Sequence, residues 1–143
     1  MEQAGDGGRL RVAVIGLGIG RTHADRYARL AGTEPVAVCD LDGEPARRVA
    51  GQYGCAAHDD PARLLEAARP QAVSLGTPPA VHPTLTALCA RRGVHVLAEK
   101  PMASTVEGCE AMIAACQRYG GTRWCSWWGT RSASSRPWSG GGG

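Results

Sequence analysis

The sequence predicts an α/β fold in which a doubly wound parallel sheet carries helices on both faces. Short apolar runs alternate with amphipathic stretches of helical periodicity along most of the chain. The connections between them are short. Strands that alternate with helices through short loops are joined by right-handed crossovers, which place the strands parallel in one sheet. With 143 residues, the chain has the length of about one domain.

The first half of the chain accounts for three of the expected strands. Leu10–Ile15 is a continuous apolar run ended by glycine, as expected of a strand that is buried on both faces. Residues 21–30 follow with helical spacing, and Gly32 is expected to end this helix. The other elements expected in this half are a strand over 35–39, a helix over 43–53 that stops at Gly54, and a short edge strand over 55–58.

The second half repeats the same alternation of strand and helix. Asp60 and Pro61 are typical of a helix start, because aspartate caps free N–H groups and proline fits the first helical position. Ser104 or Thr105 is expected to cap the last helix, although Gly108 stands where a full capping box has glutamate. The expected elements are a helix from Pro61, a strand over 72–75, a helix over 83–92, a strand over 94–98 and a last helix to about Tyr119.

Composition divides the chain into one domain, residues 9–120, and two ends. Residues 1–8 are polar and glycine-rich, which predicts a flexible lead-in and no signal peptide. Residues 121–143 contain no acidic residue, no helical period and all four tryptophans of the chain. We therefore expect a disordered, low-complexity tail.

Charge and cysteine content exclude several classes of function. The formal net charge is +3, but the excess comes from four arginines at or beyond position 118, so the body gives no reason to expect a nucleic-acid partner. The six cysteines form no Cys-x-x-Cys pair, which favours buried thiols in a reducing cytosol over metal ligands. No apolar stretch is long enough to span a bilayer. We expect a cytoplasmic protein without a metal and without a membrane partner.

The loop after the first expected strand has the sequence GLGIGR over residues 16–21. Glycine lets a chain turn tightly and approach a pyrophosphate, and the N–H groups at the start of the next helix attract its charge. Asp40 ends the second expected strand, where a carboxylate accepts hydrogen bonds from adenosine ribose hydroxyls and repels a 2′-phosphate. The pattern predicts a dinucleotide site that favours NAD over NADP. The residues predicted here to bind the cofactor are Gly16, Leu17, Gly18, Ile19, Gly20, Arg21 and Asp40.

The glycine spacing departs from the usual Gly-x-Gly-x-x-Gly pattern. Gly20 stands one residue early, and Arg21 occupies the usual place of the third glycine. Two interpretations are open at this point. Either the loop is shortened by one residue, or Arg21 caps the phosphates from the first turn of the helix.

Two further loops, GTPPAVH over residues 76–82 and EKP over 99–101, follow later strands and are expected at the same edge of the sheet. Together with the glycine loop and the segment VAVCDLD, they make residues 9–119 similar to the N-terminal half of the Gfo/Idh/MocA oxidoreductases. This family includes glucose–fructose oxidoreductase and inositol dehydrogenase. The resemblance implies a Rossmann-like NAD-binding domain.

The resemblance also implies roles for residues of the two later loops. The residues matching Thr77, Pro78 and Pro79 line the cofactor, and His82 opens the following helix nearby. Glu99, Lys100 and Pro101 are expected beside the nicotinamide, with a cis bond before the proline. Lys100 is the expected catalytic residue, because an ammonium can polarise a carbonyl or assist proton transfer as a hydride moves. His58 and His95 are expected to be structural.

Members of the family continue into a second domain that holds most of the substrate pocket. On this resemblance the chain is a truncated, cofactor-binding part of a dehydrogenase that acts on a sugar, a polyol or a related hydroxyl compound. By itself it is expected to be inactive, with a small-molecule substrate only when the second domain completes it. A stand-alone nucleotide-binding regulatory module and a non-functional truncated product are the alternatives.

The tryptophans of residues 121–143 also allow a test of the reading frame. Tryptophan has one codon, so reading from each third base forces valine across Trp124–Cys125 and across Trp127–Trp128. The same reading forces glycine across Trp128–Gly129, as in an apolar strand that ends in glycine. We hypothesise that this segment is out-of-frame translation, which the nucleotide sequence of the gene would test.

Overall fold

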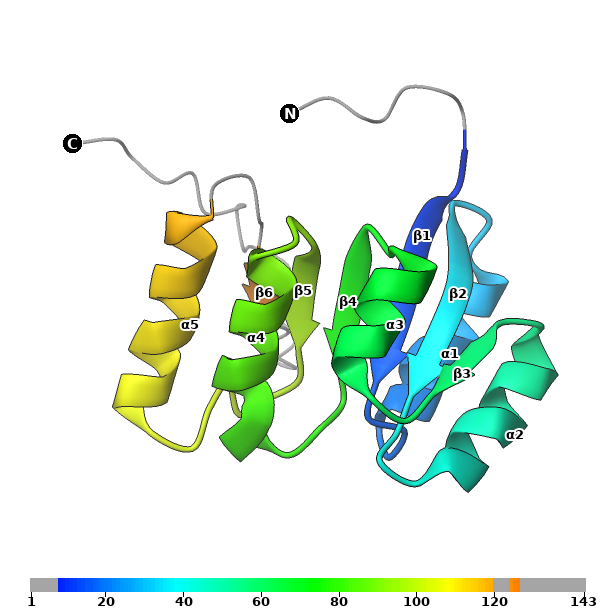
Figure 1. Cartoon of the computed structure of the whole chain (residues 1–143), viewed down its shortest axis with the longest axis horizontal. Coiled ribbons are helices and arrows are strands. Elements are labelled where there is room, and N and C mark those ends of the chain that lie inside the picture. The colour runs from blue at the N-terminus through cyan, green and yellow to red at the C-terminus, as the bar shows by residue number, and fades with distance from the viewer. Residues whose placement is uncertain (1–7, 120–123, 127–143) are drawn as a thin grey trace, which may run out of the picture.

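The structure is a computed structural model that describes residues 8–119 and 124–126. Its strands form one parallel sheet with helices on both faces, as the sequence predicts (Figure 1). The elements are β1 (Leu10–Ile15), α1 (Gly20–Arg29), β2 (Thr33–Cys39), α2 (Gly43–Tyr53), β3 (Ala56–His58), α3 (Pro61–Ala68), β4 (Ala72–Leu75), the short 3-10 helix η1 (Pro79–Val81), α4 (His82–Ala90), β5 (His95–Ala98), α5 (Val106–Arg118) and β6 (Trp124–Ser126).

The strand order is β3-β2-β1-β4-β5-β6, and every neighbouring pair is parallel. The chain moves outward from β1 to β3 and then returns to place β4 on the other side of β1. The order therefore reverses between β1 and β4. In doubly wound sheets a ligand crevice opens at this point, beyond the carboxyl ends of the strands.

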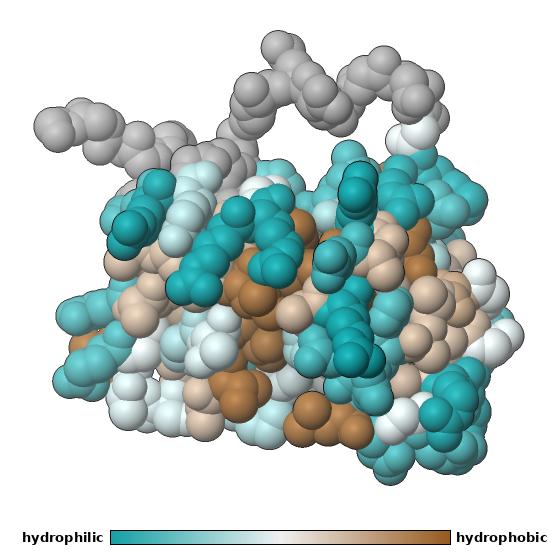
Figure 2. All heavy atoms as spheres, viewed as in Figure 1, coloured by the Kyte–Doolittle hydropathy of each residue, from teal (hydrophilic) through white to brown (hydrophobic). Residues whose placement is uncertain are grey.

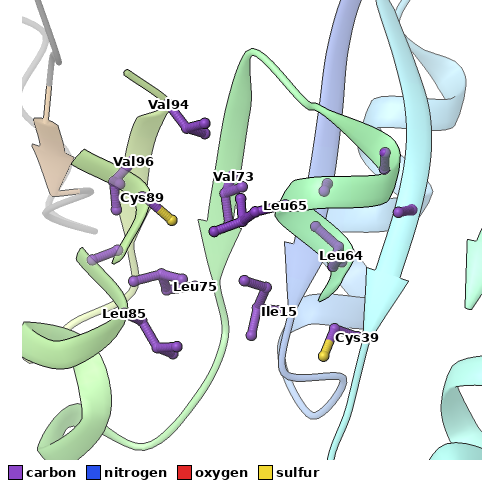
Figure 3. Close-up of a cluster of buried hydrophobic side chains, with 14 of the residues drawn as sticks. Ile15, Cys39, Leu64, Leu65, Val73, Leu75, Leu85, Cys89, Val94 and Val96 are labelled. Carbon is purple, nitrogen blue, oxygen red and sulfur yellow. The ribbon is translucent and has the colours of Figure 1, made fainter. Parts of the chain in front are cut away.

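The centre of the sheet is buried between two apolar layers. On one face α3 and α4 cover it, with α5 packed against α4. This layer includes Leu64 and Leu75 (Figure 3) and also Met112 of α5. On the other face α1 and α2 pack against β1, β2 and β3, around residues such as Val14 and Val38. Because both faces of β1 are covered, its last four residues are all buried, which explains the continuous apolar run in the sequence.

Side-chain caps fix the starts of α2, α3 and α5, and Asp42 is the cap of α2. Asp60 accepts a hydrogen bond from the N–H of Arg63 at 3.0 Å, as predicted for α3. Of the two candidates for α5, Thr105 is the cap, and its hydroxyl accepts from the N–H of Gly108 at 3.0 Å. A Cβ on Gly108 would lie 3.0 Å from the Cβ of Ala103 and 3.2 Å from Pro83, so close packing against the start of α4 disfavours a larger residue there.

Several element boundaries differ by one or two residues from the sequence prediction; α4, for example, spans His82–Ala90 in place of 83–92. The differences at β2 and α1 are instructive. The strand expected over 35–39 begins at Thr33, and Val36 forms a bulge because Val12 and Ala13 pair with Pro35 and Ala37. The first helix ends at Arg29, before Gly32, with Leu30 extended as its C-cap.

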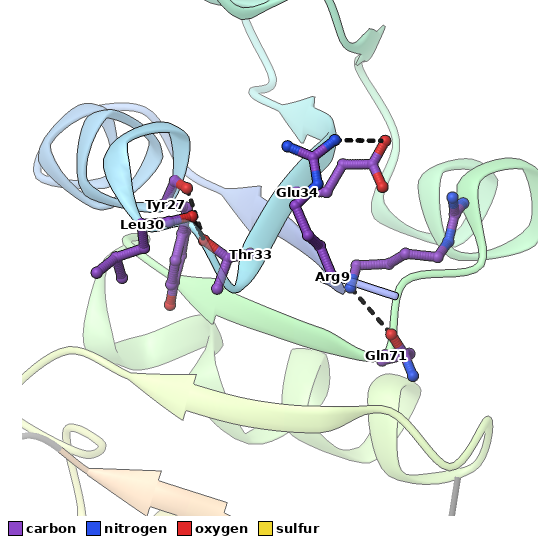
Figure 4. Close-up of polar contacts among 7 residues, drawn as sticks. Arg9, Tyr27, Leu30, Thr33, Glu34 and Gln71 are labelled. Carbon is purple, nitrogen blue, oxygen red and sulfur yellow. Dashed lines mark hydrogen bonds and ion pairs between the residues drawn. The ribbon is translucent and has the colours of Figure 1, made fainter. Parts of the chain in front are cut away.

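The hydroxyl of Thr33 explains the early helix end, because it donates to the carbonyl oxygens of Tyr27 at 2.6 Å and Leu30 at 3.3 Å (Figure 4). A side chain from β2 therefore satisfies the end of α1 in place of a left-handed glycine.

The predicted ends of the chain lie almost entirely outside the described residues. Of the lead-in 1–8 only Gly8 is described, and of the tail 121–143 only Trp124–Ser126. These three residues pair with β5 as the parallel edge strand β6. Within the described part of the chain, no helix has the length and apolar character needed to cross a membrane.

Candidate functional site

A cleft of about 500 Å³ lies at the carboxyl ends of β1, β2 and β4, where the strand order reverses. In the view of Figure 2, hydrophobic surface lies along the lower edge of the molecule, the edge at which these strands end. Six of the residues predicted to bind the cofactor line this cleft: Gly16, Leu17, Gly18, Asp40, Thr77 and Pro78.

Two glycines let the loops after β1 and β4 cross in contact. Gly16 has a left-handed backbone with φ of +89°, and a Cβ there would lie 2.7 Å from Gly76 C and from Thr77 N. A Cβ on Gly76 would lie 2.7 Å from the carbonyl oxygen of Gly16. Neither position tolerates a side chain without a backbone shift, so the shape of the crevice depends on both glycines.

Gly20 carries out the helix-packing role that the usual motif assigns to its third glycine. A Cβ on Gly20 would lie 2.8 Å from Cγ1 of Val14, so α1 begins in direct contact with β1. This geometry agrees with a loop shortened by one residue. Arg21, at the usual place of the third glycine, is exposed, and its side chain makes no hydrogen bond or ion pair with the described residues.

Gly18 differs from the other glycines of this loop, because a Cβ built on it would meet no protein atom within 4 Å. Its backbone is also outside the left-handed region. Neither packing nor conformation within the described protein therefore requires glycine at this position. The N–H groups of Gly18 and Ile19 have no hydrogen-bond partner among the described residues.

Asp40 connects the end of β2 to the glycine loop. Its Oδ2 accepts a hydrogen bond from the N–H of Leu17 at 2.9 Å, and its Oδ1 accepts from the N–H of Asp42 at 3.0 Å. A carboxylate offers about four lone-pair sites, so both oxygens retain capacity for a further donor. Asp40 thus fixes the glycine loop and presents negative charge at the cleft.

His82 is predicted to contact the cofactor, whereas its side chain is buried in the fold and does not line the cleft. Its exposed fraction is 0%. Its Nε2 lies 3.0 Å from the carbonyl oxygen of Thr77 and its Nδ1 lies 2.9 Å from that of Met102. His82 holds the turn after β4 against the loop after β5.

The loop after β5 carries the remaining predicted residues. The N–H of Glu99 donates to the carbonyl oxygen of Leu75 at 3.1 Å, and its carboxylate pairs with His23. Lys100 is exposed and has no hydrogen bond or ion pair with the described residues. The Lys100–Pro101 peptide bond is cis. These three residues, like Ile19, Gly20, Arg21 and Pro79, lie outside the lining of the cleft.

The sequence reasoning missed an apolar part of the cleft formed by Leu41, Pro61 and Val81. Leu41 is 89% exposed and Val81 is 42% exposed. The position of Leu41 directly after Asp40 is the one signal in the sequence that points to it. The hydroxyl of Thr77 is buried at this cleft and lacks a hydrogen-bond partner in the described protein.

The remaining groups at the cleft give no sign of thiol or metal chemistry. Cys39 lines the cleft, and burial together with the charges of Asp60, Asp40 and Asp59 raises the pKa of its thiol to about 12. The thiol is therefore neutral at pH 7 and a poor nucleophile or metal ligand. Among the described residues, no group of three or more histidine, cysteine, aspartate and glutamate side chains is placed to hold a metal ion.

Comparison with known proteins identifies the family. The sequence profile described as "Oxidoreductase family, NAD-binding Rossmann fold" matches residues 10–126. The chain belongs to the Gfo/Idh/MocA oxidoreductase family. Its domain is therefore an NAD-binding Rossmann domain, in agreement with the 3-2-1-4-5-6 order of its strands.

Two curated Gfo/Idh/MocA relatives illustrate the similarity. Inositol 2-dehydrogenase 4 of Saccharopolyspora erythraea is 40% identical over 116 residues, which cover 76% of this chain and 34% of the relative. D-glucoside 3-dehydrogenase of Escherichia coli is 37% identical over 123 residues, which cover 84% of this chain and 35% of the relative. The chain thus spans about a third of the length of these relatives.

A solved structure of similar fold contains a cofactor. The WlbA dehydrogenase from Bordetella pertussis, in complex with NADH and UDP-GlcNAcA, superposes with a TM-score of 0.78 at 28% identity. The match covers 82% of this chain and 36% of that protein. It therefore extends over nearly all of the described domain.

Proposed function

We propose that the cleft beside β1 and β4 binds NAD. We propose further that this domain is the cofactor-binding part of an enzyme that dehydrogenates a sugar, a polyol or a related hydroxyl compound. The observation that carries the proposal is the geometry at Gly18. A side chain there would enter space that the described protein does not use, next to the N–H groups of Gly18 and Ile19, which have no partner among the described residues. A pyrophosphate requires this combination of close backbone approach and free donors.

The donors around Gly18 suit the phosphates of a dinucleotide. The N–H groups of Gly18 and Ile19 precede α1, whose N-terminus adds positive dipole charge at the same point. Thr77, on the loop after β4, also lines the cleft, and its buried hydroxyl has no hydrogen-bond partner among the described residues. Leaving a buried hydroxyl without a partner costs about 1–3 kcal/mol, and a phosphate oxygen would remove that cost.

Asp40 and Leu41 suit the adenosine end of the cofactor. We assign the ribose hydroxyls to the carboxylate of Asp40, which holds its orientation through Leu17 and Asp42. A 2′-phosphate at this position would meet the negative charge of Asp40, which favours NAD over NADP. Leu41, Pro61 and Val81 offer an apolar surface against which a flat adenine ring can stack.

The catalytic role is assigned to Lys100. Bound NAD supplies a hydride acceptor at its nicotinamide ring. The ammonium of Lys100 is exposed and not engaged within the described protein, so it can donate a hydrogen bond to a substrate hydroxyl or carbonyl oxygen. Inositol 2-dehydrogenase 4 and D-glucoside 3-dehydrogenase, by their names, oxidise hydroxyl groups of polyols and sugars, which supports this substrate class.

Titration of the full chain with NADH tests the cofactor assignment. We expect saturable quenching or energy transfer in NADH fluorescence, and competition by ADP, because both ligands share the adenosine and phosphate contacts. NADPH serves as the matched probe and should bind more weakly. Failure to bind NADH at millimolar concentration would overturn the proposal, and tighter binding of NADPH would overturn the role of Asp40.

A further inference from the structure

The proposed function leaves a partly buried ionisable pair, His23 and Glu99, without a role. Nε2 of His23, on the first turns of α1, lies 2.6 Å from Oε1 of Glu99, which immediately precedes Lys100. The two side chains are 13% and 16% exposed, and 76 residues of sequence separate them. The pair therefore joins the helix of the glycine loop to the loop that carries the proposed catalytic lysine.

Further contacts hold the imidazole of His23 in place. The ring of Tyr27, one helical turn later, meets it edge-on with centroids 6.5 Å apart. The hydroxyl of Tyr27 is in turn hydrogen-bonded to Oγ of Ser74, which is buried in β4. A continuous chain of contacts thus runs from the centre of the sheet through Tyr27 and His23 to Glu99.

Glu99 is fixed at both its backbone and its carboxylate. Its N–H donates to the carbonyl oxygen of Leu75 at the end of β4, and its Oε1 accepts from His23. Its Oε2 has no partner among the described residues. A carboxylate held at one oxygen keeps the other available in a defined direction, which is what recognition of a ligand hydroxyl requires.

We infer that His23 is a positioning residue that orients Glu99 toward the nicotinamide half of the cofactor. The inference rests on the proposed function, because it assumes that NAD binds in the cleft with its nicotinamide end toward residues 99–101. His23 and Glu99 both lie outside the lining of the cleft. Because Oε2 of Glu99 has no partner among the described residues, His23 acts on the cofactor through Glu99. Its effect should therefore be confined to ligands that contain the nicotinamide riboside.

The test compares NADH with ADP, which lacks the nicotinamide riboside, using the full chain. The variant His23→Ala should bind NADH about tenfold more weakly, the size expected for loss of a hydrogen bond to a charged group. Its affinity for ADP should stay within about twofold, because the ADP contacts at Gly18 and Asp40 do not involve Glu99. The variant His23→Gln keeps a side-chain N–H donor and should retain most of the NADH affinity.

A matched control lies on the same helix. Arg29 is exposed and pairs with Asp25, so Arg29→Ala removes an α1 side-chain contact without touching Glu99. This variant should bind NADH and ADP like the wild type. The double variant His23→Ala/Glu99→Ala should bind NADH no more weakly than Glu99→Ala alone, because the two residues act as one unit.

The outcomes separate the inference from the proposed function. Equal losses of NADH and ADP affinity in His23→Ala, or additive losses in the double variant, would show a general structural role and overturn the inference. Unchanged NADH affinity in His23→Ala would overturn it as well, while the proposed function would stand. Absence of NADH binding by the wild type would overturn the proposed function and the inference with it.

Discussion

Gly16 and Gly18 stand two residues apart in the same loop, and the structure predicts opposite consequences for the same substitution at each. Gly16→Ala places a methyl group 2.7 Å from backbone atoms of Gly76 and Thr77 and forces alanine to a φ of +89°. Gly18→Ala meets no atom within 4 Å and needs no left-handed backbone. The first change should damage the fold, and the second should damage only ligand binding.

The magnitudes follow from these geometries. A non-glycine residue in a sparsely populated backbone region costs about 1–3 kcal/mol, and overpacking costs about 1–3 kcal/mol more. Gly16→Ala should therefore lower the free energy of unfolding by at least about 2 kcal/mol, or the Tm by roughly 10 °C for a domain of this size. Gly18→Ala should raise the free energy of unfolding by about 0.4–1 kcal/mol, because alanine restricts the unfolded chain.

The wild type and Gly18→Ala should both be well folded. Gly18→Ala should be the more stable of the two, but it should bind NADH more weakly. A methyl group at Gly18 occupies the approach of the pyrophosphate, so NADH affinity should fall at least about tenfold, equivalent to 1.4 kcal/mol. Thermal denaturation followed by circular dichroism measures the stability of each variant, and NADH fluorescence titration measures its affinity for the cofactor. Wild-type NADH affinity in Gly18→Ala, or a Tm loss equal to that of Gly16→Ala, would refute the reasoning.

Three other substitutions test the remaining parts of the cleft and core. Asp40→Ala should weaken NADH binding more than NADPH binding in a fluorescence titration. Equal losses of affinity for the two ligands would instead show that the variant only loosens the glycine loop through loss of the Leu17 contact. Leu41→Ser should weaken NADH and ADP alike without lowering the Tm, because Leu41 is 89% exposed in the free protein; a lowered Tm would show that it packs in the fold. Leu64→Ala, at a side chain with 0% exposure, should destabilise the domain by about 2–5 kcal/mol in urea titration, and a cost near zero would mean that α3 is not held on the sheet as described.

Burial raises the pKa of the Cys39 thiol from 9.0 to about 12. The stability linked to this group is therefore complete below pH 9 and is lost as the pH rises toward 12. Labelling of Cys39 by a thiol reagent at pH 8 should be slow in the folded chain and fast in urea, and fast labelling of Cys39 without urea would contradict its burial.

Local sequence patterns determined the fold class and most of the element boundaries. Continuous apolar runs, helix caps such as Asp60 and loops rich in glycine are consequences of short-range chemistry, and they are visible without the fold. The same patterns indicated which loops end at the carboxyl edge of the sheet. They therefore predicted Gly16, Gly18 and Asp40 as neighbours of a cofactor, and the family resemblance added Thr77; all four line the cleft.

Only the tertiary structure decided which of these residues face the cleft and which hold its loops. The roles of the three glycines depend on how closely β4 and α1 approach the loop, because Gly16 and Gly20 are limited by atoms of Gly76 and Val14. His82 has both ring nitrogens on carbonyl oxygens of separate loops, and no local pattern specifies that burial.

The pairing of His23 with Glu99 has the same origin. Contacts between residues so far apart in sequence arise from the order of strands in the sheet and from the crossing of β1 and β4 loops. Periodicity and spacing carry information about neighbours along the chain, whereas these contacts depend on neighbours in space. The sequence by itself thus determined the elements and the candidate loops, and the packing of the sheet decided which side chains face the cleft and which hold its loops in place.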